Sequence, residues 1–144
     1  MRFSKSTHAV YHLEYHVVWT TRYRRKILVE GIRQYLTRVL ENLDELDGDI
    51  EVKKVNVQVD HVHMIVVVPP RLSLASVIGF FKSQTAKHLK HKFSNLETGI
   101  FGRGSIWSRG YCVTTVGTNE AFIMHYVEHQ EKEDKGLVQL SLGV

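Results

Sequence analysis

The apolar segment at residues 61–68 ends at Pro69 and Pro70, the only two prolines in the chain. It is rich in β-branched residues, which is typical of a strand. Proline lacks the backbone N–H that a strand ladder uses, so the strand must end there. Residues 50–60 also have a strand pattern, and the short connection at Asp60 predicts that the two strands pair antiparallel.

The other segments switch between two hydrophobic periods. Residues 11–21 alternate apolar and polar side chains, as a strand does, whereas residues 29–46 repeat apolar side chains every three or four positions, as a helix does. Ser73 and Asn119 are natural N-caps for two further helices. The predicted elements, in chain order, are strand 11–21, helix 29–46, strands 50–60 and 61–68, helix 73–93, a loop at 96–108, strand 111–116 and helix 119–132. This order predicts an α+β fold, a ferredoxin-like split βαβ antiparallel sheet with an added C-terminal helix.

Composition indicates a single domain over residues 1–144. The hydrophobic share is 43% and the charged share 24%, as in an ordinary globular protein. No segment is apolar enough for a signal peptide or a membrane span. Cys112 is the only cysteine and cannot form an internal disulfide, so we expect a cytoplasmic protein. The net charge of +4 is only a weak indication of a nucleic-acid partner.

His61 and His63 are candidates for binding a metal ion. Residues two apart on a strand point to the same face, about 6.6 Å apart along the chain, so two imidazoles can converge on one ion. The residues that follow are strongly apolar, and buried histidines are unfavourable unless a partner satisfies them. Backbone carbonyls, or exposure at the strand end, would satisfy them as a metal would.

Tyr126 and Gln130 lie four residues apart on the last predicted helix, and therefore on one helical face. The alternative is that Phe122, Ile123, Tyr126 and Val127 are simply the core side of an amphipathic helix. Combined with the histidine pair, however, the tyrosine completes a phosphoryl-transfer site. A metal would polarise the phosphate while the hydroxyl attacks phosphorus. A free phenol has a pKa near 10, so it needs a neighbouring cation or base.

Four segments in this order resemble the single-tyrosine HUH transposases (U is hydrophobic) of the IS two-hundred / IS six-hundred-and-five insertion-sequence group of bacteria and archaea. They are HVVWTTRYRRKIL, HVH, IWSRGYCVTTVG and YVEHQ, and the similarity covers nearly the whole chain. The resemblance implies that His61, His63 and Gln130 bind Mg²⁺ or Mn²⁺, with His129 as a rival third ligand. It also implies that Tyr126 is the nucleophile of a DNA transposase. Single-stranded DNA would be cleaved and rejoined at insertion-sequence ends through a 5′-phosphotyrosine intermediate, without ATP.

The same resemblance implies a homodimer with composite active sites, the histidines coming from one subunit and the tyrosine helix from the other. Excision requires two cuts and the helix carries one tyrosine, so two subunits would supply two. The implied partner is single-stranded DNA with hairpin ends. Tyr23 and Trp107 are candidates for stacking on unpaired bases, although packing of Trp107 under its own loop is an equal alternative. The candidate phosphate contacts are Arg22, Arg24, Arg25, Lys26, Lys82, Lys87 and Arg109.

Three other functions are compatible with the same residues. A metal-dependent nuclease would use water as its nucleophile and leave Tyr126 incidental, although two-histidine RNA phosphoesterases usually carry two H-x-T/S motifs. A non-catalytic RNA-binding module would need aromatic residues in its central strands, and residues 61–68 have none. A domesticated relative that processes repetitive palindromes would differ only in the DNA that flanks its gene.

Overall fold

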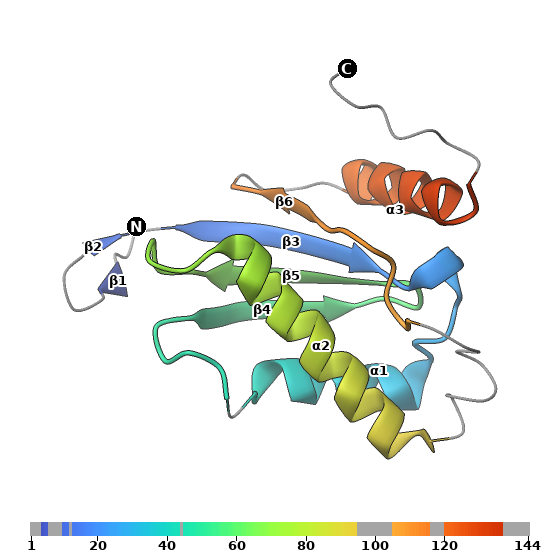
Figure 1. Cartoon of the computed structure of the whole chain (residues 1–144), viewed down its shortest axis with the longest axis horizontal. Helices are drawn as coiled ribbons and strands as arrows, with labels where there is room; N and C mark the ends of the chain where they lie inside the picture. Colours follow the sequence, from blue (N-terminus) through green and yellow to red (C-terminus); the bar gives the residue numbers. More distant parts are fainter. Residues whose placement is uncertain are drawn as a thin grey trace.

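The computed structural model describes residues 4–5, 10–11, 13–43, 45–94, 105–115 and 120–136. It is an α+β structure whose principal elements follow the order that the sequence predicts (Figure 1). A short N-terminal hairpin and one 3₁₀ turn are added to that order. The elements are β1 (Ser4–Lys5), β2 (Val10–Tyr11), β3 (Glu14–Thr20), the 3₁₀ turn η1 (Arg22–Arg24), α1 (Glu30–Glu41), β4 (Glu51–Val57), β5 (His61–Val67), α2 (Leu74–Lys92), β6 (Cys112–Thr114) and α3 (Glu120–Asp134).

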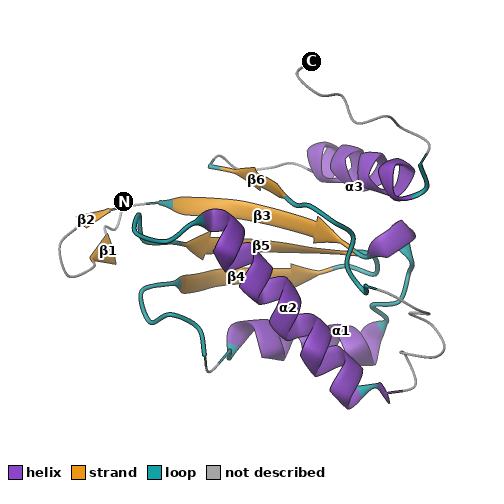
Figure 2. Ribbon diagram, in the orientation of Figure 1, coloured by secondary structure: helices purple, strands orange, loops and turns teal. Residues whose placement is uncertain are grey.

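One four-stranded sheet has the order β4-β5-β3-β6, and its neighbouring strands are all antiparallel (Figure 2). β5 therefore has a hydrogen-bonded strand on each side. The register places Val18 of β3 opposite His63 and Thr20 opposite His61. Asn56 of β4 lies opposite His63 from the other side. These pairings decide which side chains surround the two histidines.

The two faces of this sheet are covered by different helices. α1 and α2 cover one face, where the main hydrophobic core includes Trp19 of β3 and Met64 of β5. α3 lies across the sheet from them (Figure 1), and its Ile123 and Val127 pack on Val18. Side chains alternate along β3, so Val18 and Trp19 must point in opposite directions.

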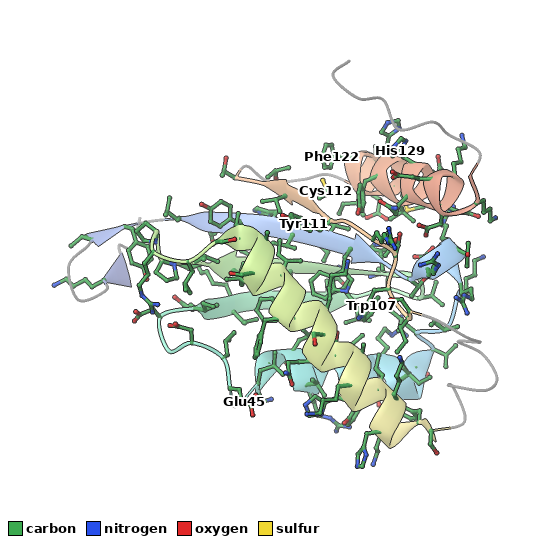
Figure 3. All side chains as sticks on the ribbon, in the orientation of Figure 1. Glu45, Trp107, Tyr111, Cys112, Phe122 and His129 are labelled. Carbon is green, nitrogen blue, oxygen red and sulfur yellow. The ribbon has the colours of Figure 1, made fainter. Side chains whose placement is uncertain are left out.

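Trp107 belongs to the main core. It is 3% exposed, and its ring meets the edge of Trp19 at a centroid distance of 5.9 Å. Its Nε1 donates to the carbonyl of Lys82 at 3.1 Å and to the hydroxyl of Thr85 at 3.0 Å. Figure 3 places the residue beside α2. The prediction that Trp107 stacks on unpaired bases is therefore wrong, and its alternative, packing under the loop, is confirmed.

α1 ends earlier than its apolar period predicts. The last helical residue is Glu41, because Asn42 leaves the helical conformation with φ −136° and ψ 38°. The Asn42 side chain donates to the carbonyl of Arg38 at 2.9 Å and so satisfies one of the free carbonyls at the helix end. Leu43 and Leu46 still pack against the core from the turn that follows. The apolar repeat of the sequence thus continues past the end of α1 into the turn that follows it.

Other boundaries differ by a few residues. Tyr11 belongs to β2, which pairs with β1, and β3 begins only at Glu14. Ser73 caps α2 as predicted, since its Oγ accepts from the N–H of Ser76 at 3.2 Å. The expectation for Asn119 lies outside the described residues, as does most of the predicted loop. Among the helices that the structure describes, none is both long and apolar enough to cross a membrane.

Candidate active site

His61 and His63 lie on the face of the sheet that α3 covers. Val62 between them is fully buried in the core under α1 and α2, and neighbouring side chains on a strand point to opposite faces. The two imidazoles therefore share one face, as their spacing predicts. His61 is 5% exposed and His63 is partly buried.

Asp60 determines which nitrogen of His61 carries the proton. Its Oδ1 lies 2.8 Å from His61 Nδ1, and its Oδ2 accepts from Arg24 Nε, also at 2.8 Å. Burial by itself would raise the pKa of the Asp60 carboxyl, but the bonds from His61 and Arg24 outweigh it and lower that pKa. An ionised carboxylate can only accept, so His61 Nδ1 must donate, and Nε2 is the nitrogen that carries the lone pair in the neutral form of the ring. Histidine ligands of metals take this form.

His63 has a ring nitrogen without a partner. Its Nε2 is buried, and no hydrogen bond reaches it from the described residues. Burial lowers the pKa of His63, and the charges of His16 and His61 lower it further, so the ring is neutral near pH 7. Such an unpaired nitrogen destabilises the fold unless a ligand satisfies it. The neutral ring of His63 beside a second imidazole that a carboxylate orients fits a divalent metal site.

The histidine pair lacks a third ligand of the commonest types. In the described parts of the chain, no group of three His, Cys, Asp or Glu residues is arranged to hold a metal ion. Among the described residues, a further ligand would therefore be of another type, such as an amide.

His16 of β3 is a neighbour of His63 that the sequence analysis did not single out. The two ring centroids are 5.6 Å apart, with 34° between the ring planes. His16 Nδ1 and Thr20 Oγ1 are also buried without a described partner. Alternation along residues 11–21 places His16 on the polar side of its strand. Only the register of β3 against β5, which the sequence does not reveal, shows that it meets His63.

Tyr126 and Gln130 form a second pair on α3. The Tyr126 hydroxyl donates to Gln130 Oε1 at 3.5 Å, and its ring packs near Cys112 of β6. Gln130 is 5% exposed, and its Nε2 donates to Asp134 at 3.3 Å. Burial raises the pKa of Tyr126 well above the ordinary tyrosine value, and Cys112 adds to this effect. His129, the rival third ligand, lies on the exposed side of the helix (Figure 3).

Asp134 fastens the end of α3 to the rest of the molecule. It accepts hydrogen bonds from the hydroxyl of Ser108 at 2.6 Å and from the backbone N–H of Tyr23 at 3.0 Å. Tyr23 and Arg24 have positive φ angles of 59° and 55°. Non-glycine residues adopt this conformation at a cost of about 1–3 kcal/mol each. The surrounding contacts therefore hold the η1 turn in a shape that it would not take alone.

Arg24 connects the two halves of the candidate site. Its Nε lies 2.8 Å from the Asp60 carboxylate, and one of its terminal nitrogens lies 3.4 Å from Glu131 of α3. These contacts raise the pKa of Arg24, the bond to Asp60 having the largest effect. A single guanidinium thus links the carboxylate that orients His61 to the helix that carries Tyr126.

The two pairs lie on the same face of the sheet. Tyr126 packs on the cluster of Val18, Ile123 and Val127, and Val18 lies opposite His63 in the sheet. Within the described ranges, no hydrogen bond, ion pair or ring contact joins Tyr126 or Gln130 to His61 or His63. The structure therefore brings together the members of each pair, but not all four residues.

Two of the predicted DNA contacts have partners inside the protein. Arg24 is paired with carboxylates, as described above. Lys82 Nζ donates to the carbonyls of Ser108 and Gly110 at 2.8 and 3.0 Å, and burial lowers the pKa of this lysine. Both side chains fasten the segments around α3 in this conformation.

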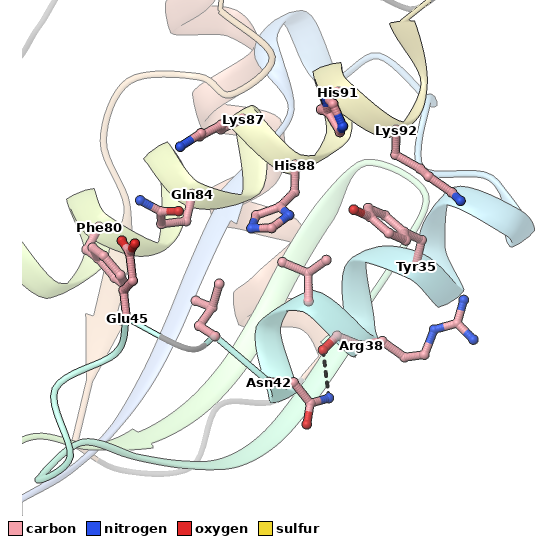
Figure 4. A pocket seen from close by; sticks show the side chains of 12 residues that line it. Tyr35, Arg38, Asn42, Glu45, Phe80, Gln84, Lys87, His88, His91 and Lys92 are labelled. Carbon is pink, nitrogen blue, oxygen red and sulfur yellow. Dashed lines mark hydrogen bonds between the residues drawn. The ribbon is translucent and has the colours of Figure 1, made fainter.

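The other predicted contacts are more accessible. Arg22 and Arg25 lie over the ring of Tyr23, at 5.1 and 5.5 Å from its centroid, and that ring is 40% exposed. Three more are exposed and form no ion pair with the described residues: Lys26, Lys87 and Arg109. Lys87 stands apart from the rest, because it lines a groove of about 780 Å³ between α1 and α2 (Figure 4). Tyr35, Phe80 and Arg38 also line this groove, on the helical layer across the sheet from the histidines.

Comparison with known sequences gives close and nearly full-length matches. A family model described as "Transposase IS200 like" matches residues 9–130. The transposase for insertion sequence element IS200 of Salmonella typhimurium is 33% identical over 135 residues, which cover 94% of this chain and 88% of that protein. The ISDra2 transposase TnpA of Deinococcus radiodurans is 29% identical over 135 residues, covering 93% and 95%.

Solved structures give the same result for the fold. A crystal structure from Deinococcus radiodurans R1, described as that of a transposase, matches with a TM-score of 0.77 at 29% identity, covering 88% of this chain and 97% of that one. The structure of a REP-associated tyrosine transposase bound to a REP hairpin matches with a TM-score of 0.51 at 17% identity, covering 93% and 76%. At that identity the second likeness concerns the fold alone.

Proposed function

The chain belongs to the IS200-like transposase family, and from this premise we propose that it cleaves and rejoins single-stranded DNA at insertion-sequence ends, with Tyr126 as the nucleophile. One observation carries the proposal: the His61–His63 pair and the Tyr126–Gln130 pair occupy the same face of one sheet. A nuclease that uses water would need the histidines but no tyrosine on that face.

We assign His61, His63 and Gln130 as ligands of a divalent ion, Mg²⁺ or Mn²⁺. The free Nε2 of His63 and the carboxylate-oriented His61 support this assignment, and the amide of Gln130 supplies the residue type that the pair lacks. When bound, the ion would polarise the scissile phosphate and stabilise the charge that develops on its oxygens. Imidazole ligands favour Mn²⁺ over Mg²⁺.

The reaction exchanges one phosphate ester for another. The Tyr126 oxygen bonds to phosphorus as the bond from phosphorus to the 3′ oxygen breaks, leaving a 5′-phosphotyrosine and a 3′ hydroxyl. The proton lost by the phenol balances the proton that the 3′ oxygen gains. Because the ester retains the energy of the broken bond, a 3′ hydroxyl can attack it in the reverse direction. Rejoining therefore consumes no ATP.

Tyr126 must leave its present surroundings before it can react. Burial raises its pKa, and its hydroxyl is bonded to Gln130 of its own helix. We therefore assign the reacting state to a homodimer with composite sites, in which α3 of one subunit reaches the histidines of its partner. The absence of any hydrogen bond, ion pair or ring contact between the two pairs, among the described residues, supports this arrangement.

The substrate that we propose is single-stranded DNA with hairpins near the cleaved ends. The REP-associated transposase, which shares this fold, is bound to a hairpin. On this chain, exposed cations lie near the η1 turn and β6, and the exposed ring of Tyr23 can stack on an unpaired base. The exposed cations are Lys26 and Arg109, and Arg22 beside them is partly exposed.

A denaturing-gel assay for covalent protein–DNA adducts tests the proposal. Single-stranded DNA carrying the element ends would be incubated with Mn²⁺ or Mg²⁺ and with the wild type, Tyr126→Phe or Tyr111→Phe. Tyr111 is a matched control, because it is an exposed tyrosine next to β6. The wild type and Tyr111→Phe should form adducts, whereas Tyr126→Phe and samples with EDTA should form none.

Two other results would identify the competing functions. Cleavage that persists undiminished in Tyr126→Phe, with no adduct, would contradict the tyrosine mechanism and favour a nuclease that uses water. Adducts on repetitive palindromes, but not on the ends of the element, would identify a domesticated relative.

A further inference from the structure

His16 is a third histidine on the face that carries His61 and His63. It lies on β3, where Thr114 of β6 is its partner in the sheet, and its ring contacts that of His63 at a centroid distance of 5.6 Å. Its Nδ1 and the Nε2 of His63 are both buried, and neither has a hydrogen-bond partner in the described part of the chain. The two unsatisfied nitrogens thus belong to rings in contact.

This arrangement destabilises the protein when nothing is bound. A buried polar atom without a partner costs about 1–3 kcal/mol, and an apolar ring at position 16 would avoid that cost for Nδ1. Local rules of stability are broken most often where a site serves a ligand. The ligand must lie on this face, because both rings are there.

We propose that His16 is a positioning residue of the metal site: its ring orients His63, and its Nδ1 makes a hydrogen bond that only the metal-loaded site offers. The inference rests on the proposed role of His61 and His63 as metal ligands. His16 is not assigned as a ligand itself, since no three His, Cys, Asp or Glu residues of the described chain are arranged around one ion. It therefore acts through His63.

Metal titration and thermal unfolding together test this inference. Co²⁺ would be added to the metal-free protein and followed by its visible absorption, and Mn²⁺ by electron paramagnetic resonance. Both readouts are independent of DNA cleavage. Loss of a partner that orients a metal ligand typically weakens binding by about 10–100-fold, and we expect this range for His16→Phe. The same variant should melt no lower than the wild type without metal, because phenylalanine keeps the ring and removes an unsatisfied nitrogen.

Two further variants complete the design. His16→Asn keeps a polar group near the position of Nδ1 and should recover part of the lost affinity. His88 is an exposed histidine of α2 on the opposite side of the sheet, so the control variant His88→Phe should bind metal like the wild type.

The possible failures are distinguishable. If His16→Phe binds metal like the wild type, the inference about His16 is wrong while the metal site stands. If His16→Phe and His16→Asn both melt lower without metal and bind equally weakly, His16 has only a packing role. If the wild type binds no metal, or binds no better than His61→Ala, then the proposed metal site itself fails.

Discussion

Asp60 controls the chemistry of His61 through one hydrogen bond, and Arg24 determines how that bond responds to mutation. The guanidinium requires an acceptor on Asp60, and the carboxylate satisfies both neighbours at once with its two oxygens. An amide at this position has one oxygen and one NH₂. Arg24 would take the oxygen, so the NH₂ would face His61 and donate to its Nδ1. The proton of His61 would then move to Nε2, where it blocks metal binding.

Asp60→Asn is therefore expected to weaken metal binding by about 10–100-fold, although it changes only one atom. Arg24→Gln should have a smaller effect, because it leaves the carboxylate that accepts from His61. Calorimetric titration with Mn²⁺ would measure both, with the surface variant Asp47→Asn as a control. Equal metal affinity in Asp60→Asn and the wild type would show that the position of the proton on His61 does not control metal binding.

The Tyr126 phenol should titrate late in the DNA-free protein. Burial raises its pKa above the ordinary value of 10.0. A raised pKa in the folded state gives a contribution to stability that is complete below pH 10, and that is lost as the pH rises through the folded-state pKa. Ultraviolet difference titration of the wild type against Tyr126→Phe isolates this one phenol. A Tyr126 signal that is complete below pH 10 would mean that the phenol is already activated without DNA.

α3 rests on the sheet through few apolar contacts. Ile123 and Val127 pack on Val18, while most of the remaining attachment is polar and lies near the η1 turn. Elements with little buried apolar surface open more readily than the core does. α3, the helix that carries Tyr126, is therefore expected to be the first part of the described fold to detach.

Asp134→Ala should loosen α3 without unfolding the sheet. The substitution removes acceptors of the Ser108 hydroxyl and the Tyr23 N–H, and hydrogen bonds to a charged group contribute about 1.5–3 kcal/mol. Hydrogen exchange within α3 should then rise about 10–100-fold, while β5 keeps its protection. Glu133→Gln is the control, because its only described ion pair is a 4.0 Å contact with an exposed histidine. Unchanged exchange in Asp134→Ala would show that apolar packing alone holds the helix.

Elements with local signals were predictable from the sequence, and those that depend on distant contacts were not. β5 is bounded by its prolines, and α2 by the Ser73 cap, so both were predicted within a residue or two. α1 was predicted too long. Leu43 and Leu46 continue the apolar repeat of the helix, but they lie in the turn after it and pack on the core from there. The shared face of His61 and His63, in contrast, was predictable from their spacing of two residues along one strand. The contact with His16 depends on strand register, which is a property of the folded sheet.

At the scale of the whole molecule, the sheet separates two surfaces. One carries the histidines and α3, and the other carries α1, α2 and the groove lined by Lys87. Among the described residues, no hydrogen bond, ion pair or ring contact joins the histidines to Tyr126. In the dimer that we propose, a second subunit would supply the tyrosine helix.

Mixing two inactive variants should restore cleavage. A subunit with His61→Ala and His63→Ala keeps Tyr126, and a Tyr126→Phe subunit keeps the histidines, so a mixed dimer with composite sites contains one complete site. After random exchange of subunits, activity should reach about a quarter of the wild-type level, since half of the dimers are mixed and each has one working site of two. The adduct assay on equal mixtures measures this. Mixtures as inactive as either variant alone would place both halves of each site in the same chain.

Arg24 lies between Asp60 and Glu131, and this position limits which substitutions relatives of this chain can accept there. Lysine carries a point charge on a flexible stem and cannot fork between two carboxylates as a planar guanidinium does. A lineage that loses the arginine would leave Asp60 buried with a weaker partner, and Glu131 with its ion pair to Lys135 of the same segment but without the one to the η1 turn. We therefore expect positions 24, 60 and 131 to be inherited as one unit, although more than a hundred residues separate the first from the last. A sequence survey should find them changing together or not at all.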